Sequence, residues 1–181
     1  MPDPNVKISK FLSLILRHAP EKIGIHLDAN GWVVVDDLLS ATKAHGTEIF
    51  REQLDEVVFR NDKQRFAFSP DGLRIRANQG HSVDIDLELP PVTPPSVLFH
   101  GTAMRFLPSI ESQGLQRMSR QHVHLSAARE QAHRVGARHG RPVVLEIDAK
   151  GMNDTGHLFF LSANGVWLTE FVPVDFIKND G

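Results

Sequence analysis

The sequence predicts an α+β protein made of two small domains, and three observations support this. The first 80 residues show apolar residues at helical spacing, followed by two short alternating runs. The residues after 96 show several strand-like apolar runs and only two helical segments. Between these parts lies a segment with four prolines, which neither a helix nor a central strand tolerates. We therefore expect domains at 1–89 and 96–181, joined by a stiff linker at 90–95.

The N-terminal domain is predicted to begin with three helices. Apolar residues recur at helical spacing from Val6 to Leu16, and Pro20 ends this pattern, so Arg17 and His18 lie at a helix C-terminus. The turn Asn30-Gly31 leads into a short apolar run before the second helix. The residues expected to cap the second and third helices are Asp36 or Asp37, and Thr47.

A β-hairpin is predicted to follow the helices. The alternating runs Arg65–Phe68 and Leu73–Arg76 flank the turn sequence Ser69-Pro70-Asp71-Gly72. Three helices followed by a hairpin are the element order of a winged helix, a common nucleic-acid-binding form. A small α+β packing module has the same pattern, and both interpretations stay open.

The C-terminal domain is predicted to be mainly a β-sheet with two helices. One helix spans the region of Phe106 to Ile110 and closes at Gly114, and Ser126 is expected to cap the other, which runs through Ala137. The expected strands are Val97–Phe99, Val123–Leu125, Val143–Ile147, Leu158–Leu161 and Val166–Phe171.

Composition excludes several classes of protein. Hydrophobic residues make up 41% and charged residues 23% of the chain, as in ordinary globular proteins. The absence of cysteine excludes disulfide frameworks, thiolate nucleophiles and cysteine-based metal sites. No run of about 18 apolar residues occurs, and residues 1–20 contain no signal-peptide cleavage site. We expect a soluble, cytoplasmic protein that does not bind membranes.

Charge is distributed unevenly along the chain. Residues 1–90 carry a net charge of −3 and residues 91–181 a net charge of +1. The window from Arg117 to Arg141 contains six arginines, four histidines and one acidic residue, Glu130. Because the guanidinium fork suits bidentate contact with phosphate, this window indicates an anionic ligand, although a solvated helix face would look the same.

Several residues have both a structural and a functional interpretation. His100 ends a strand and is followed by Gly101, which lets backbone approach a ligand, and by Thr102, which offers a hydroxyl. His122 and His124 share a strand face and could bind zinc together with His100, although no third ligand has a recognisable spacing. No metal is therefore expected.

Seven segments along the chain form the most specific pattern in the sequence. They are Leu16-Arg17-His18-Ala19-Pro20, Leu27-Asp28-Ala29-Asn30-Gly31-Trp32-Val33, Asn61-Asp62-Lys63-Gln64-Arg65-Phe66, Leu98-Phe99-His100-Gly101-Thr102, Gln113-Gly114-Leu115, Met118 to Ser126 and Asn164 to Thr169. Taken together, in order and over nearly the whole chain, these segments resemble those of the NAD-dependent RNA 2′-phosphotransferases known from tRNA splicing.

The resemblance implies a winged-helix-like lobe that binds RNA, joined to an ADP-ribosyltransferase-like lobe that binds NAD as a co-substrate. It implies that an internal RNA 2′-phosphate attacks C1″ of the nicotinamide ribose and releases nicotinamide. The ribose O2″ then attacks the phosphorus of this 2′-phospho-ADP-ribosylated RNA. The products are RNA with a free 2′-hydroxyl and ADP-ribose 1″,2″-cyclic phosphate.

The resemblance also assigns roles to residues. Arg17, Arg65 and Arg120 match the phosphate-binding arginines of the family, and His18 matches its catalytic histidine, which transfers a proton as either base or acid. From the arginine-rich window we also predict that Arg138 contacts NAD or the RNA backbone. The residues that match the NAD site are His100, Gly101, Thr102, Gly114, Leu115, His124, Leu125 and Ser126.

Two alternatives remain. A mono-ADP-ribosyltransferase acting on phosphorylated nucleic-acid ends or on protein would have a glutamate where this chain has Val166, although Glu170 lies on the same segment. A winged-helix DNA-binding regulator would need a basic N-terminal half, whereas this half is acidic. The partner we expect is a 2′-phosphorylated RNA, tRNA-like or other, bound by a monomer with no obligate protein partner.

Overall fold

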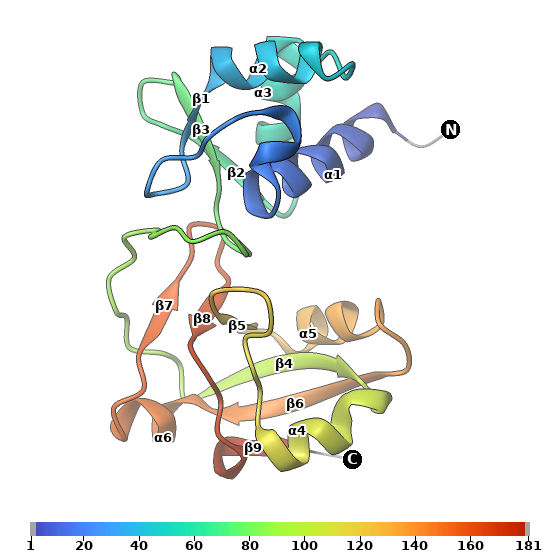
Figure 1. Cartoon of the computed structure of the whole chain (residues 1–181). Helices are drawn as coiled ribbons and strands as arrows, with labels where there is room; N and C mark the ends of the chain where they lie inside the picture. The colour runs from blue at the N-terminus through green and yellow to red at the C-terminus, as the bar shows by residue number, and fades with distance from the viewer. Residues whose placement is uncertain (1–2, 180–181) are drawn as a thin grey trace. The chain divides into compact units, whose positions relative to one another are not determined.

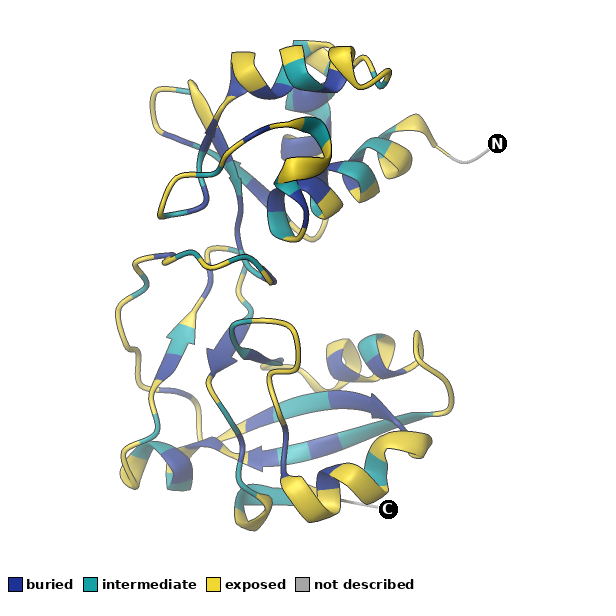
Figure 2. Cartoon of the chain, viewed as in Figure 1, coloured by how far each residue is buried: buried dark blue, intermediate teal, exposed yellow. Residues whose placement is uncertain are grey.

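The computed structural model describes residues 3–179, and the chain divides into two compact units, Met1–Glu88 and Leu89–Gly181 (Figure 1). The division lies beside the proline-rich segment that was expected to separate two domains. Each unit has its own hydrophobic core, seen as dark blue segments inside it (Figure 2). Helices and antiparallel sheets occur together, which confirms the α+β class.

The N-terminal unit contains the three predicted helices and the predicted hairpin. A third strand completes the sheet, whose antiparallel order is β1-β3-β2. The elements are α1 (Pro4–Arg17), the 3-10 helix η1 (Pro20–Ile23), β1 (Val33–Val34), α2 (Val35–Ala44), α3 (Arg51–Phe59), β2 (Phe66–Phe68) and β3 (Arg74–Ala77).

The core of this unit fixes the C-terminal end of α1. Leu12, Ile15 and Leu16 of α1 are fully buried with Leu54 of α3 and Ile75 of β3. Burying a leucine or isoleucine side chain contributes about 1.5–3 kcal/mol, so these residues hold the last two turns of the helix firmly. Arg17, the last residue of α1, and His18, which follows it, therefore stand at a firmly held helix end.

Two of the predicted helix caps were wrong. Asp36 and Asp37 lie inside the first turn of α2, which begins after Val34 and has no side-chain cap. Val34 can take this place because it ends a strand, and its extended backbone leads directly into the helix. The third helix begins at Arg51 instead of near Thr47, and the amide of Phe50 is satisfied by Oε1 of Gln53 at 3.0 Å.

The C-terminal unit contains two antiparallel three-stranded sheets instead of one, ordered β4-β6-β9 and β5-β8-β7. Phe99 and Ser126 join β4 to the residue after β5 through two backbone hydrogen bonds of 2.8 Å. The elements are β4 (Val97–Ala103), η2 (Met104–Phe106), α4 (Leu107–Gln113), β5 (Val123–Leu125), α5 (Arg129–Gly136), β6 (Pro142–Asp148), α6 (Ala149–Asp154), β7 (Phe159–Leu161), β8 (Trp167–Thr169), η3 (Val174–Phe176) and β9 (Ile177–Asn179).

Three sequence predictions for this unit were wrong or incomplete. Ser126 does not cap α5, because its backbone pairs with Phe99 and the helix begins three residues later, after Ala128. A third helix, α6, is capped by Asp148, whose Oδ1 accepts from the amide of Gly151 at 2.9 Å. The short edge strand β9 was not predicted either.

Within the described residues 3–179, no helix combines the length and the apolar composition needed to cross a bilayer.

Candidate functional site

In the N-terminal unit, the predicted catalytic pair stands where α1 ends. Arg17 is the last residue of α1, and His18 follows it as an exposed C-cap residue. The imidazole Nδ1 of His18 lies 2.9 Å from Oγ of Ser82. The amides of Ser82 and Val83 both donate to the carbonyl oxygen of Arg17, at 2.9 and 3.3 Å. A segment 64 residues away in sequence therefore supports this end of the helix.

Arg65 is held against the same helix, at Ser9. Its Nη1 atom lies 3.3 Å from Oγ of the buried Ser9 and 3.5 Å from Oδ1 of Asn61. Nδ2 of Asn61 also reaches this hydroxyl, at 3.3 Å. Ser9 and Arg17 are eight residues apart, which is about 12 Å along the helix axis. Of the predicted residues of this unit, Arg17 and His18 thus lie at the end of α1, and Arg65 contacts the same helix at Ser9.

A buried histidine, His81, lies near the half-buried arginines Arg17 and Arg76. His81 is 1% exposed, and burial, together with the nearby charges of Arg17, Arg76 and His18, lowers its pKa to about 4. Neither ring nitrogen of His81 has a hydrogen-bond partner within the described residues. The guanidinium of Arg76 lies 4.4 Å from the centre of the Trp32 ring, a favourable cation–π contact. At neutral pH His81 is therefore an uncharged residue among arginines.

In the C-terminal unit, His100 lies where β4 meets β5. Its Nδ1–H donates to the carbonyl oxygen of His124 at 3.0 Å, and a carbonyl can only accept, so Nδ1 carries the proton. Burial lowers the pKa of His100, which keeps the ring neutral. Nε2 of His100 is therefore an acceptor, suited to a hydroxyl group.

Arg120 approaches the same place from the loop that precedes β5. Its Nη1 atom donates to Nδ1 of His124 over 3.3 Å, and its carbonyl oxygen accepts from Nη1 of Arg117 at 3.1 Å. A guanidinium group is always a donor, so Nδ1 of His124 is the acceptor in this contact. Arg120, His124 and His100 thus form a connected group within the C-terminal unit.

Two glycines of the predicted NAD site, Gly101 and Gly114, have packing roles that the sequence did not indicate, and their contact with NAD stays a prediction. A Cβ atom at Gly101 would lie 1.6 Å from the carbonyl oxygen of Ala132, so the absent side chain lets α5 pack on β4. Gly136 of α5 returns this contact against Thr102. Gly114 has a φ of +75°, and a Cβ there would lie 2.2 Å from the carbonyl oxygen of Val172.

The other residues of the predicted NAD site differ in exposure. Thr102, Leu115 and Leu125 are buried, so their side chains shape the protein rather than line an open surface. His124 and Ser126 are partly exposed, as is His100. Contact with a ligand would therefore involve the histidines, Ser126 and backbone groups of this junction.

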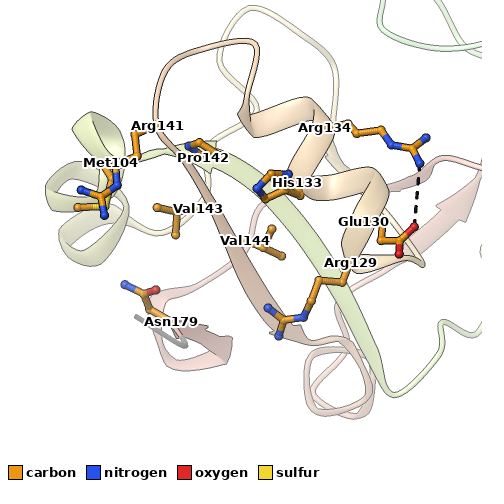
Figure 3. A pocket seen from close by; sticks show the side chains of 10 residues that line it. All are labelled: Met104, Arg129, Glu130, His133, Arg134, Arg141, Pro142, Val143, Val144 and Asn179. Atoms are coloured by element: carbon orange, nitrogen blue, oxygen red, sulfur yellow. Dashed lines mark ion pairs between the residues drawn. The ribbon is translucent and has the colours of Figure 1, made fainter.

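The remaining arginines lie on or near α5. Arg129 pairs with Glu146 and lies 5.3 Å from the Phe99 ring centre, while Arg134 is 4.0 Å from Glu130 on the surface. Arg138 is exposed after the helix. An open groove of about 650 Å³ lies beside α5 and β6, and Figure 3 labels the side chains that line it. Its lining residues are Met104, Arg129, Glu130, His133, Arg134, Arg141, Pro142, Val143, Val144 and Asn179.

The structure gives no support to the zinc hypothesis. His100 uses Nδ1 on a backbone oxygen, and the ring of His122 lies 5.6 Å from that of Phe160. Among residues 3–179, no group of three or more histidine or carboxylate side chains is arranged to hold a metal ion.

Sequence reasoning missed the residues that support the predicted ones. Ser9 and Ser82 contact Arg65 and His18, and His81 is buried beside Arg17. Ser9 carries no local signal because it occupies an ordinary helix position, and Ser82 follows 64 residues after its partner. Asn61 could have been found, since it stands four residues before Arg65 in one of the motif segments.

Comparison with known proteins identifies a matching family. A family model described as "RNA 2'-phosphotransferase, Tpt1 / KptA family" matches residues 3–171. A probable RNA 2'-phosphotransferase of Hahella chejuensis is 56% identical over 170 residues, covering 94% of this chain and 91% of that protein. Proteins with the same name from Streptomyces griseus and Acaryochloris marina are 54% and 55% identical, covering 95% and 93% of this chain, and 95% and 93% of their own lengths.

Proposed function

The chain belongs to the Tpt1/KptA family of RNA 2′-phosphotransferases, which makes it a transferase, and from this membership we propose that it moves an internal 2′-phosphate from RNA to NAD. The observation that carries the proposal is the match over residues 3–171, which includes every residue predicted to act in catalysis. These residues are Arg17, His18, Arg65 and Arg120.

The proposed reaction has two steps. The RNA 2′-phosphate first bonds to C1″ of the nicotinamide ribose, and the bond to nicotinamide breaks. The ribose O2″ then bonds to phosphorus, and the bond from phosphorus to the RNA O2′ breaks. The second step thus gives RNA with a 2′-hydroxyl and ADP-ribose 1″,2″-cyclic phosphate, whereas nicotinamide is a product of the first.

The N-terminal unit supplies groups suited to the RNA phosphate. The nucleophile of the first step is already an anion, so the step needs orientation more than a base, and guanidinium forks provide this. Arg65 is held by Ser9 and Asn61, which reduces the freedom lost when it binds a phosphate. His18 is exposed, and an imidazole can both accept and donate a proton, which suits proton transfer in the second step.

The C-terminal unit supplies groups suited to NAD. Nε2 of His100 is an acceptor that fits a ribose hydroxyl, and the neutral ring avoids placing a charge there. His124 stands between His100 and Arg120, and the guanidinium of Arg120 fits a phosphate oxygen. In the second step, arginines at the phosphate stabilise the charge that builds on its oxygens.

The test is NAD-dependent loss of a 2′-phosphate. The purified protein is incubated with a short RNA that carries one internal 2′-phosphate, with and without NAD, and with unphosphorylated RNA as control. We expect nicotinamide release and phosphate loss only when both substrates are present. Nicotinamide release without phosphate loss would show instead an ADP-ribosyltransferase that stops after the first step, and no release at all would contradict the proposal.

A further inference from the structure

We propose that Ser82 is a positioning residue, which holds His18 by Nδ1 and thereby assigns proton exchange with the substrate to Nε2. This inference rests on the proposed function, because it concerns how one residue of that site is oriented. The observation behind it is the 2.9 Å contact between Oγ of Ser82 and Nδ1 of His18.

The backbone fixes the position of the serine hydroxyl relative to His18. The amides of Ser82 and Val83 both donate to the carbonyl oxygen of Arg17, the residue directly before His18. The last carbonyls of a helix lack partners within the helix, so this segment satisfies one of them. Ser82 is thus attached to the same turn of chain that carries the histidine.

The segment around Ser82 is also anchored on both sides. Upstream, His81 is 1% exposed and lies so close to Gly31 that a Cβ there would be 3.4 Å from its Nε2. Downstream, the amide of Asp86 donates to the carbonyl oxygen of Ala29 at 2.8 Å, and Nδ2 of Asn30 donates to the carbonyl oxygen of Asp86 at 2.8 Å. Ser82 therefore does not sit on a freely moving loop, and its hydroxyl is preorganised.

The direction of the serine hydrogen bond decides what His18 can do. A hydroxyl can donate or accept. If Nδ1–H donates to Oγ, the bond persists whether the ring is neutral or cationic, because Nδ1 keeps its proton in both states. If the hydroxyl donates to Nδ1 instead, the neutral ring carries its proton on Nε2 and that atom cannot act as a base.

The second step needs a group that takes one proton and returns one. As O2″ bonds to phosphorus, its proton moves to Nε2 of His18. As the bond from phosphorus to O2′ breaks, Nε2 gives a proton to O2′ and the ring is neutral again. While Nδ1–H stays bonded to Ser82, Nε2 is available for both proton transfers. One histidine therefore acts first as a base and then as an acid, and the serine is chemically unchanged.

The first test reads the tautomer directly and does not depend on activity. Long-range ¹H–¹⁵N NMR distinguishes protonated from unprotonated ring nitrogens, and a His18→Gln variant identifies the signals of His18 among those of the 10 histidines. In the neutral ring of the unaltered protein we expect a proton on Nδ1 and none on Nε2. An unprotonated Nδ1 would overturn the inference.

The second test separates positioning from folding. We expect Ser82→Ala to slow the conversion of ADP-ribosylated RNA about tenfold, the effect of one lost hydrogen bond, with NAD affinity unchanged. Ser82→Thr keeps the hydroxyl and is expected to restore most of the rate. The matched control is Ser40→Ala, an exposed serine of α2. Equal second-step rates for Ser82→Ala and the unaltered protein would overturn the inference.

The two tests distinguish failure of the inference from failure of the proposed function. If the protein did not consume a 2′-phosphate at all, the proposed function would fall, and the tautomer of His18 would still show whether Ser82 holds Nδ1. If Ser82→Ala did not fold, the NMR measurement on the unaltered protein would decide alone.

Discussion

Arg65 reaches Ser9 on α1 and is met by Asn61 from its own segment, while His18 is met by Ser82. In both cases a small polar residue orients a larger one through a hydrogen bond, to Nη1 of Arg65 and to Nδ1 of His18. Such support reduces the conformational freedom that the larger side chain would lose on binding a phosphate. The residues proposed to act on the substrate and the residues that orient them are therefore different sets.

Replacing Arg65 or Arg120 with alanine is expected to slow the second step most. These guanidinium groups are proposed to stabilise charge on the phosphoryl oxygens, and removing one such donor costs about 10²–10³-fold in rate. Single-turnover assays with labelled RNA should show the ADP-ribosylated intermediate accumulating. Arg60→Ala, which alters only an exposed ion pair with Glu56, is the control. Rates equal to those of the unaltered protein in both steps would contradict the assigned roles.

Acid is expected to destabilise the N-terminal unit through His81. The pKa of His81 is about 4 in the folded protein and about 6.5 when unfolded. Above pH 6.5 both states are neutral, but between pH 6.5 and 4 the unfolded state binds a proton that the folded state does not. The free energy of unfolding should therefore fall by up to about 1.4 kcal/mol per pH unit over this range.

The measurement is urea unfolding followed by Trp32 fluorescence, in a Trp167→Phe background so that only the N-terminal unit is observed. His81→Leu should flatten the dependence between pH 6.5 and 4, whereas His26→Leu, at an exposed position, should not. A slope unaffected by His81→Leu would show that another group is responsible.

At the scale of elements, the contact between β4 and α5 fixes the strand that carries His100, a residue of the proposed NAD site. Gly101 and Gly136 face each other across this contact, and β4 carries His100 directly beside it. Close backbone approach between a strand and a helix is possible only where side chains are missing. The histidine is thus placed by a glycine contact that has no chemistry of its own.

Gly101→Ala is expected to destabilise the C-terminal unit by about 3 kcal/mol or more, because its Cβ would overlap the backbone of α5. Thermal unfolding measures the loss. Gly165→Ala is the control: its φ of +80° makes alanine strained, but no atom lies within 4 Å, so a smaller loss of about 1 kcal/mol is expected. Equal losses would mean that strain, not packing, sets the effect.

Periodicity predicted most elements because buried positions in α1 and in strands such as β6 follow simple repeats. Helix starts were less predictable, since Val34 and Ala128 begin helices through strand geometry and no side chain marks them. The division into two sheets was also unpredictable, because it depends on which strands pair across long sequence separations.

The residues proposed to react were named from motifs, whereas the supporting residues Ser9, Ser82 and His81 could not be. His18 and Arg120 stand in recognisable segments. Ser82 becomes relevant only because the fold returns it to the end of α1, and the close packing of Gly101 against α5 is visible only in the structure. Contacts between distant segments carry this information, and local sequence does not.

At the scale of the whole molecule, the proposed chemistry is divided between two units with separate cores. Arg17, His18 and Arg65 belong to Met1–Glu88, and the residues proposed to bind NAD belong to Leu89–Gly181. The N-terminal half is acidic overall, so we expect the proposed RNA recognition to depend on local arginines and not on net charge.

The C-terminal unit expressed alone, residues 89–181, is therefore expected to fold and to bind NAD with an affinity within about tenfold of that of the whole chain, a difference of about 1.4 kcal/mol. It should not remove a 2′-phosphate, because Arg17, His18 and Arg65 are missing. Isothermal titration calorimetry measures the binding, and His124→Ala in the same fragment should weaken it. A folded fragment without affinity for NAD would show that the N-terminal unit is needed for NAD binding.

The most direct measurement of the central claim follows a single phosphorus atom. An RNA whose internal 2′-phosphate carries ³²P is incubated with the protein and NAD, and the labelled products are separated. The proposed transfer predicts that the label moves quantitatively into ADP-ribose 1″,2″-cyclic phosphate and that the RNA regains a 2′-hydroxyl. Label released as inorganic phosphate, or label that stays in the RNA, would contradict the transfer to NAD.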